Sequence, residues 1–196
     1  HHKHRPTLMD PDPEAVGVRL DFYRRVAAMG HDLGAEVVSF WAGTDPEPGP
    51  DSEVRLRDGG ARAAEAIAEA GLTPALEPEP GMAVATLGDW RQLRKQLPGP
   101  GVALALDVGH LWVEWEGDPY RLIRGCGPEL VQVHLEDMRR GQHVHLAPGE
   151  GEVDFHRVRQ TLLDADYRGA VCFELSRDSH RAPELVRRCA ETWSSD

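Results

Sequence analysis

Short apolar segments alternate with helical segments along the chain, and this alternation constrains the fold more than any other feature. Helices are predicted over residues 11–33, 52–70, 83–96, 118–126, 154–165 and 182–193. Strands are predicted over residues 35–43, 72–77, 101–107, 129–135 and 169–175. Apolar strands that alternate with helices are typical of a parallel sheet covered on both faces. The sequence therefore predicts an α/β fold, with residues 138–154 as a long polar loop.

Composition limits the classes of protein to which the chain can belong. Its 196 residues suffice for one sizeable domain, and we expect a single domain over residues 1–196. The net charge of -11 argues against nucleic acid as a partner. No apolar run approaches the roughly 20 residues of a membrane helix, so no membrane association is expected. The first ten residues contain no apolar core of a signal peptide.

The three cysteines, Cys126, Cys172 and Cys189, are sparse, odd in number and without a CxxC spacing. This pattern is typical of free thiols in a reducing compartment. Together with the absence of an apolar leader, it predicts a cytoplasmic protein.

Four of the five predicted strands end in a side chain that can bind a metal or transfer a proton. These residues are Glu77, Asp107, His134 and Glu174, whereas the first strand ends in Trp41. Parallel strands lie about 4.8 Å apart and their carboxyl ends share one edge, so these side chains can converge. Three carboxylates and an imidazole would be costly to bury without a partner, and one divalent ion (Mn²⁺, Mg²⁺, Co²⁺ or Zn²⁺) would remove that cost.

Each residue alone also has a purely structural interpretation. A strand-end Asp such as Asp107 often caps the next helix. The histidine in "VQVHL" can be a satisfied core residue, and Glu174 can be the first solvated residue after a strand. The conjunction of all four favours the metal interpretation.

Further polar and aromatic residues follow the same strand ends. They are His110, Arg140, His143, His145 and Glu150, with Glu79 at the rim and Trp41, Trp112 and Trp115 as a candidate apolar wall for a sugar. The alternatives are a solvated surface loop for the polar residues and ordinary core or rim packing for the tryptophans.

Several segments between residues 72 and 175 carry a resemblance to a known family. They are "PALEPEPG", "LALDVGH", "VQVHLEDMRRG", "HVHLAPGEGEVDF" and "YRGAVCFEL". In these segments the chain resembles the xylose isomerase-like barrel superfamily, which contains sugar and sugar-phosphate isomerases and epimerases, with endonuclease IV as a relative.

The resemblance implies roles for particular residues. Glu77, Asp107, His134 and Glu174 would hold one divalent ion, and the two glutamates would also act as acid and base. His110 and Arg140 would contact the substrate, and we assign His145 to the same substrate-binding set. In endonuclease IV the corresponding loop carries Asp-x-His for a further zinc. This chain has His143 in place of that Asp, so the multi-zinc site is not expected.

The resemblance also implies a (β/α)₈ TIM barrel, of which only the last five strand–helix units are visible here. Such a barrel takes roughly 250 residues, so we expect three N-terminal units to be missing from these residues. The open edges of an incomplete parallel sheet invite association, so a homo-oligomer is possible.

The leading hypothesis is a metal-dependent isomerase or epimerase of a small sugar-like polyhydroxy carbonyl compound. The ion would stabilise the enediolate that forms when a proton is removed. A dehydratase or lyase would use the same residues. The alternatives are a phosphodiester hydrolase of the endonuclease IV type, which the acidic charge disfavours, and a non-catalytic barrel subunit.

Overall fold

The computed structural model describes residues 4–97 and 101–194. The prediction that residues 1–10 contain no signal-peptide core falls partly outside these ranges, because residues 1–3 are not described. The chain forms two compact units, residues 1–105 and 106–196, and the division falls inside strand β3 (Ala103–Asp107). Each unit is described by itself below.

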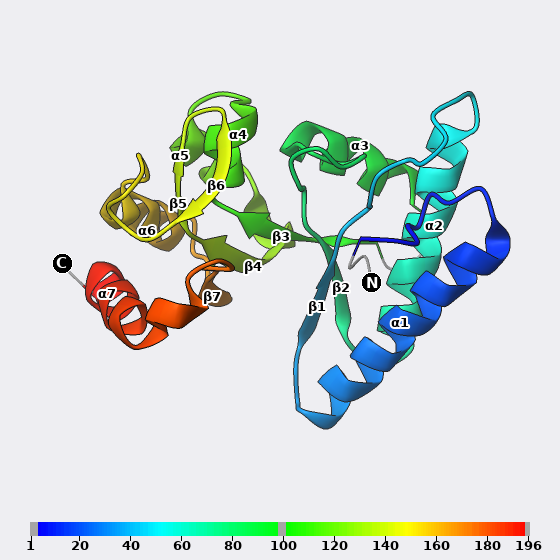
Figure 1. Ribbon diagram of the computed structural model, residues 1–196, viewed down its shortest axis with the longest axis horizontal. Coiled ribbons are helices and arrows are strands. Elements are labelled where there is room, and N and C mark those ends of the chain that lie inside the picture. The colour runs from blue at the N-terminus through cyan, green and yellow to red at the C-terminus, as the bar shows by residue number, and fades with distance from the viewer. Residues whose placement is uncertain (1–3, 98–100, 195–196) are drawn as a thin grey trace. The chain divides into compact units, whose positions relative to one another are not determined.

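The first unit alternates helices and parallel strands, as predicted. Its elements are α1 (Pro13–Asp32), β1 (Val37–Phe40), α2 (Ser52–Ala68), β2 (Thr73–Leu76), α3 (Leu87–Gln96) and the first part of β3. Strand β1 pairs with β2, and Leu76 of β2 pairs with Leu104 of β3. Helices α1 and α2 pack against each other (Figure 1).

The helix starts of the first unit follow from local sequence. Asp12 accepts a hydrogen bond from the Glu14 N–H at the start of α1, where Pro13 occupies the first position. Thr86 and Asp89 form a capping box at the start of α3. Gly59 inside α2 has a packing reason, because a Cβ atom there would lie 2.2 Å from the Leu8 carbonyl oxygen.

The second unit contains the remaining strands of the sheet and a separate hairpin. Its elements are α4 (His110–Glu114), α5 (Pro119–Arg124), the short helix η1 (Gly127–Glu129), β4 (Leu130–Leu135), β5 (Asp137–Arg139), β6 (Gln142–Leu146), α6 (Phe155–Asp164), β7 (Ala170–Phe173), the short helix η2 (Ser179–Arg181) and α7 (Ala182–Ser194). The hairpin of β5 and β6 packs against α4 (Figure 1).

The hydrogen-bonded order of the main sheet is β1-β2-β3-β4-β7, which follows the order of the strands in the sequence. The printed registers of the main sheet, β1 with β2, β2 with β3 and β4 with β7, are all parallel. The five predicted parallel strands are therefore confirmed. Leu104, Ala105 and Leu106 of β3 are all buried, as expected for a central strand covered on both faces.

The prediction of a long polar loop over residues 138–154 is wrong for its first half. The hairpin β5–β6 occupies residues 137–146, with Asp137 opposite Leu146 and Arg139 opposite Gln142. Gly141, in the turn between β5 and β6, has a φ of 70°. Glycine adopts this left-handed conformation without steric cost because it has no Cβ atom. The strands are short, and the single alternation of Val144 and Leu146 with His143 and His145 is too brief to distinguish a strand from a polar loop.

The described residues include no helix long and apolar enough to cross a membrane. All three cysteines are free in the structure, with Cys126 and Cys189 buried and Cys172 exposed.

Candidate metal centre

Three of the four predicted metal ligands converge within the second unit. Asp107 ends β3, His134 lies near the end of β4, and Glu174 directly follows β7. One potential ligand atom from each residue lies within 4.8 Å of those of the other two. The register explains part of this arrangement: His134 pairs with Cys172, so Glu174, two residues further on, projects from the same face of the sheet as His134.

The imidazole of His134 has a partner on each ring nitrogen. Its Nδ1 lies 3.5 Å from Glu174 Oε2, and its Nε2 lies 2.8 Å from the side-chain amide of Gln132. A histidine that binds a metal through Nδ1 carries its proton on Nε2 and donates it to an acceptor. In the structure the Gln132 amide nitrogen faces the ring. A flip of the amide by 180° brings its oxygen to the ring instead, and this oxygen can accept the hydrogen bond from Nε2.

Asp107 combines the two roles that the sequence left open. Its Oδ1 accepts the backbone N–H of His110 at 3.3 Å, at the start of α4, and its Oδ2 lies 3.6 Å from His110 Nε2. Its side chain is almost entirely buried. Asp107 therefore caps the turn after β3 and still belongs to the group of potential metal ligands.

Glu77, the fourth predicted ligand, lies in the first unit directly after β2. Its backbone N–H donates to the Phe40 carbonyl at 3.0 Å, which continues the β1–β2 pairing. Its Oε2 accepts the indole N–H of Trp41 at 2.9 Å. Trp41, which the sequence suggested as an apolar wall, thus also orients a buried carboxylate.

The donor set of the second unit fits a divalent cation. Two carboxylates and an imidazole are the ligands that Mn²⁺, Mg²⁺, Co²⁺ and Zn²⁺ accept in proteins, and bond lengths of about 2.0–2.2 Å are compatible with donors separated by this distance. Burial is graded, since the side chain of Asp107 is 1% exposed, that of His134 12% and that of Glu174 38%. Glu174 is therefore the most solvent-exposed of the three potential ligands.

A second cluster shares Asp107 and includes a residue that the sequence interpretation missed. Potential ligand atoms of Asp107, His110 and Glu136 lie within 4.8 Å of one another, and all three residues are buried. Glu136 is wholly inaccessible to solvent. Gly109 permits this packing, because a Cβ atom there would lie 2.4 Å from Glu136 Oε1. The available signal was a charged residue directly after an apolar strand, in "VHLE".

The hairpin adds two histidines to this cluster. His143 and His145 lie two residues apart on β6, with ring centroids 5.1 Å from each other. The His143 ring is also 5.0 Å from that of His110, and His145 Nδ1 lies 3.8 Å from Glu136 Oε2. Burial lowers the pKa of His143, and the neighbouring charges of His145 and Arg177 lower it further.

The remaining predicted residues lie at the rim of the second unit. The Arg140 guanidinium carbon lies 3.7 Å from the centre of the Trp115 ring, and both residues are exposed. Trp112 is instead a buried core residue against Tyr120. Glu150 pairs with Arg188 at 3.1 Å.

Asp137 organises the glycine-rich loop that follows the hairpin, and sequence reasoning did not single it out. Its Oδ2 accepts the N–H groups of Gly149 and Gly151 at 2.7 and 2.8 Å, and its Oδ1 accepts that of Val153 at 2.9 Å. A Cβ atom at Gly151 would lie 2.3 Å from Asp137 Oδ1, so glycine is required there. Asp137 lies 12 to 16 residues before these partners, so local sequence gave no signal for the contacts.

Comparison with known proteins agrees with this fold. The family model described as xylose isomerase-like TIM barrel matches residues 1–194. L-ribulose-5-phosphate 3-epimerase UlaE of Shigella flexneri is 27% identical over 192 residues, which cover 95% of this chain and 67% of that protein. The chain thus spans about two thirds of the length of this relative.

Solved structures give the same result. Protein SMc04130 from Sinorhizobium meliloti 1021 matches with a TM-score of 0.77 and 26% identity, covering 96% of this chain and 75% of that chain. The 3-keto-D-glucoside 4-epimerase YcjR from E. coli matches with a TM-score of 0.77 and 21% identity, covering 98% and 76%. The predicted resemblance and the barrel fold class are confirmed.

Proposed function

The chain belongs to the xylose isomerase-like TIM barrel family, and from that membership we propose that it is a divalent-metal-dependent epimerase of a small ketose or ketose phosphate. One observation carries the proposal. Asp107, His134 and Glu174, at the ends of three adjacent strands, bring potential metal-ligand atoms within 4.8 Å of one another. Relatives named as sugar epimerases support the choice of reaction.

We include Glu77 as the fourth ligand on the basis of strand register. Leu76 pairs with Leu104, so Glu77 is level with Ala105 of β3. Residues two apart on a strand project from the same face, so Glu77 shares the face of Asp107. Since β2 neighbours β3 in the sheet, all four ligand-bearing strand ends are consecutive in the strand order.

The proposed chemistry is proton exchange at a carbon next to the substrate carbonyl. When bound, a divalent ion supplies positive charge beside the substrate oxygens as negative charge develops on them. One of the two glutamates, Glu77 or Glu174, removes the proton, and the other returns a proton to the opposite face of the carbon. This exchange inverts the configuration of the carbon without any net oxidation.

The other predicted residues position the substrate in this proposal. Arg140, held over the Trp115 ring, offers a cationic group that suits a hydroxyl-rich or phosphorylated ligand. His110 and His145 lie at the buried side of the site, where His110 faces Asp107 and His145 faces Glu136.

Metal content tests the ligand set. We expect the purified chain to retain about one divalent ion after dialysis against metal-free buffer, and the Asp107→Asn variant to lose it. Asp164→Asn, which changes an exposed carboxylate of the same unit, is the matched control and should load like the wild type. Equal loading of wild type and Asp107→Asn would overturn the assignment.

Solvent exchange tests the reaction. The full-length protein with Mn²⁺ is incubated in D₂O with L-ribulose 5-phosphate or with unphosphorylated ketoses, and deuterium incorporation is followed by proton NMR. Glu77→Gln and Glu174→Gln should each slow exchange by about 10²–10⁴-fold, the usual contribution of a general base. Wild-type turnover in both variants would refute the acid–base roles. Cleavage of abasic DNA without exchange would favour the hydrolase instead.

A further inference from the structure

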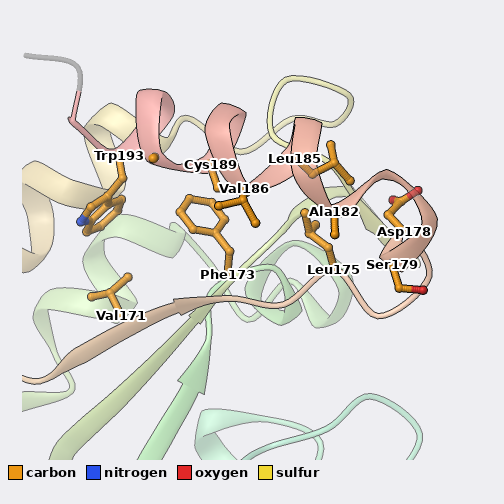
Figure 2. A pocket seen from close by; sticks show the side chains of 11 residues that line it. Val171, Phe173, Leu175, Asp178, Ser179, Ala182, Leu185, Val186, Cys189 and Trp193 are labelled. Atoms are coloured by element: carbon orange, nitrogen blue, oxygen red, sulfur yellow. The ribbon is translucent and has the colours of Figure 1, made fainter.

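A pocket of about 430 Å³ lies between β7 and α7 in the second unit. Figure 2 shows apolar side chains such as Phe173 and Trp193 lining it, and its charged residue, Asp178, at one end. An apolar lining with a carboxylate does not suit an anionic group of a sugar-like ligand. The rim of the same unit, where Arg140 lies over Trp115, offers the opposite chemistry.

The guanidinium of Arg140 is held by an aromatic ring and not by a carboxylate. Its carbon lies 3.7 Å from the centre of the Trp115 ring. Within residues 4–97 and 101–194 no carboxylate forms an ion pair with it, and Glu152 accepts the backbone N–H of Arg140 at 3.4 Å. Stacking occupies the face of a guanidinium and leaves the N–H groups in its plane available. Those N–H groups match two oxygens of a phosphate.

Trp115 reaches this position at a steric cost. It ends α4 with a φ of 49° and a ψ of 54°, in the left-handed region. Glycine is the usual residue in this conformation at a helix end, because a bulky side chain disfavours it. Trp115 is also 40% exposed, so burial in the core does not explain the indole. The side chain therefore has a role other than ending the helix.

A second stacked pair in the same unit shows that stacking alone does not require such a backbone. The guanidinium carbon of Arg157 lies 3.8 Å from the centre of the Tyr120 ring. Tyr120 lies inside α5, is buried, and has no positive φ. The cost at Trp115 is thus particular to the pair at the rim.

The backbone fixes the two segments that carry this pair. The Gly141 N–H, in the turn that follows Arg140, donates to the Trp112 carbonyl of α4 at 3.0 Å. Trp115 lies at the end of the same short helix. The turn and the ring are therefore joined before any ligand binds, and donors that are already ordered lose less freedom on binding.

We propose that Trp115 is a positioning residue that holds the Arg140 guanidinium for a phosphate group, so that the substrate class is a ketose phosphate. The inference rests on the proposed epimerase function for the sugar part of the ligand and on the Arg140–Trp115 pair for its phosphate. A phosphate monoester carries about −1.5 to −2 charges at pH 7. In a chain of net charge -11, a guanidinium without a carboxylate partner supplies local attraction for such a group. The indole makes no bond to the substrate and acts through Arg140.

An NMR titration tests the phosphate site without any turnover. The Nε–H resonance of Arg140, assigned by its loss in Arg140→Gln, is followed in the Mg²⁺-loaded protein as inorganic phosphate is added. We expect a saturable shift in the wild type, with an affinity about 10–100-fold lower in Trp115→Leu. Trp115→Phe keeps an aromatic face and should restore most of the affinity. Arg157→Gln removes the other stacked arginine and is the matched control, with wild-type affinity expected.

Trp115→Gly separates a positioning role from a structural one. Glycine relieves the steric conflict at this φ, so the Tm should stay at the wild-type value or rise while phosphate affinity falls as in Trp115→Leu. A residue required only for the fold would show a lower Tm with unchanged phosphate affinity.

Kinetics on two substrates test the assignment during turnover. In Trp115→Leu the KM for a ketose phosphate should rise by about 10–100-fold with kcat little changed, because the lost interaction binds a part of the substrate remote from the reacting carbon. The kcat/KM for the corresponding unphosphorylated ketose should match that of the wild type.

Three results would overturn the proposal. The first is a wild-type Arg140 Nε–H resonance that phosphate does not shift. The second is equal phosphate affinity in the wild type and Trp115→Leu. The third is an equal loss for phosphorylated and unphosphorylated ketoses, which would assign the pair to a hydroxyl group. The first two need no epimerase activity, so a failure of the proposed function is distinguished from a failure of this site.

Discussion

Replacement of Asp137 by Asn would test how the glycine-rich loop of the second unit is held. Oδ1 accepts the N–H groups of Met138 and Val153, and Oδ2 accepts those of Gly149 and Gly151. Asn has one oxygen, so in either orientation its NH₂ group faces two N–H donors. A hydrogen bond to a charged group contributes about 1.5–3 kcal/mol, so the loss of two predicts a destabilisation of about 3–6 kcal/mol. This is a large part of a typical free energy of unfolding, about 5–15 kcal/mol.

Urea unfolding and native-state hydrogen exchange measure this effect. We expect a lower free energy of unfolding and faster exchange of the Gly149 and Gly151 amides in Asp137→Asn. If the loop opens locally, exchange accelerates more than global stability falls. Asp164→Asn, at an exposed site, should stay within about 0.5 kcal/mol of wild type. A change below about 1 kcal/mol in Asp137→Asn, with unchanged glycine exchange, would refute the reasoning.

Three further predictions concern the neighbouring residues. Gln132→Leu removes the partner of His134 Nε2 and should weaken divalent-metal binding, measured by titration calorimetry, by about 10–100-fold; unchanged affinity would contradict the positioning role. Burial lowers the pKa of His143 below 6.5, so the unfolded state binds more protons and wild-type stability should fall as pH drops below that value toward the folded-state pKa. Unfolding curves between pH 8 and 5 should show a smaller loss in His143→Gln, and identical slopes would count against this explanation. Gly109→Ala forces a Cβ atom against Glu136 and should cost about 1–3 kcal/mol, seen as a lower Tm by circular dichroism; a wild-type Tm would show that the site relaxes.

The strand-end residues were predictable because two local signals coincide. A parallel strand buried on both faces reads as a continuous apolar run, so the first polar residue after it marks the carboxyl end of the strand. Asp107 and Glu174 follow such runs directly, and His134 interrupts one near its end. The sheet topology then brings these residues together without any further information from the side chains.

The hairpin and its partners were not predictable in the same way. Its two strands have three and five residues, and the alternation of Val144 and Leu146 with His143 and His145 covers only four residues, too few to indicate a strand. Asp137 satisfies backbone groups that lie up to 16 residues further along the chain. Contacts of this range depend on the path of the loop, which local spacing does not encode.

The buried charges link the candidate metal centre to this hairpin. Asp107 and Glu136 are two buried carboxylates that both lie close to His110. Burial of carboxylates close to one another is costly, and Glu174 adds a third carboxylate within 4.8 Å of Asp107. A divalent ion held by Asp107, His134 and Glu174 would offset the carboxylates it contacts and leave Glu136 to pair with His110 and His145. On this argument such an ion would also stabilise the packing of β6 against α4, because His110 of α4 and His145 of β6 both lie near Glu136 and the two clusters share the carboxylate of Asp107.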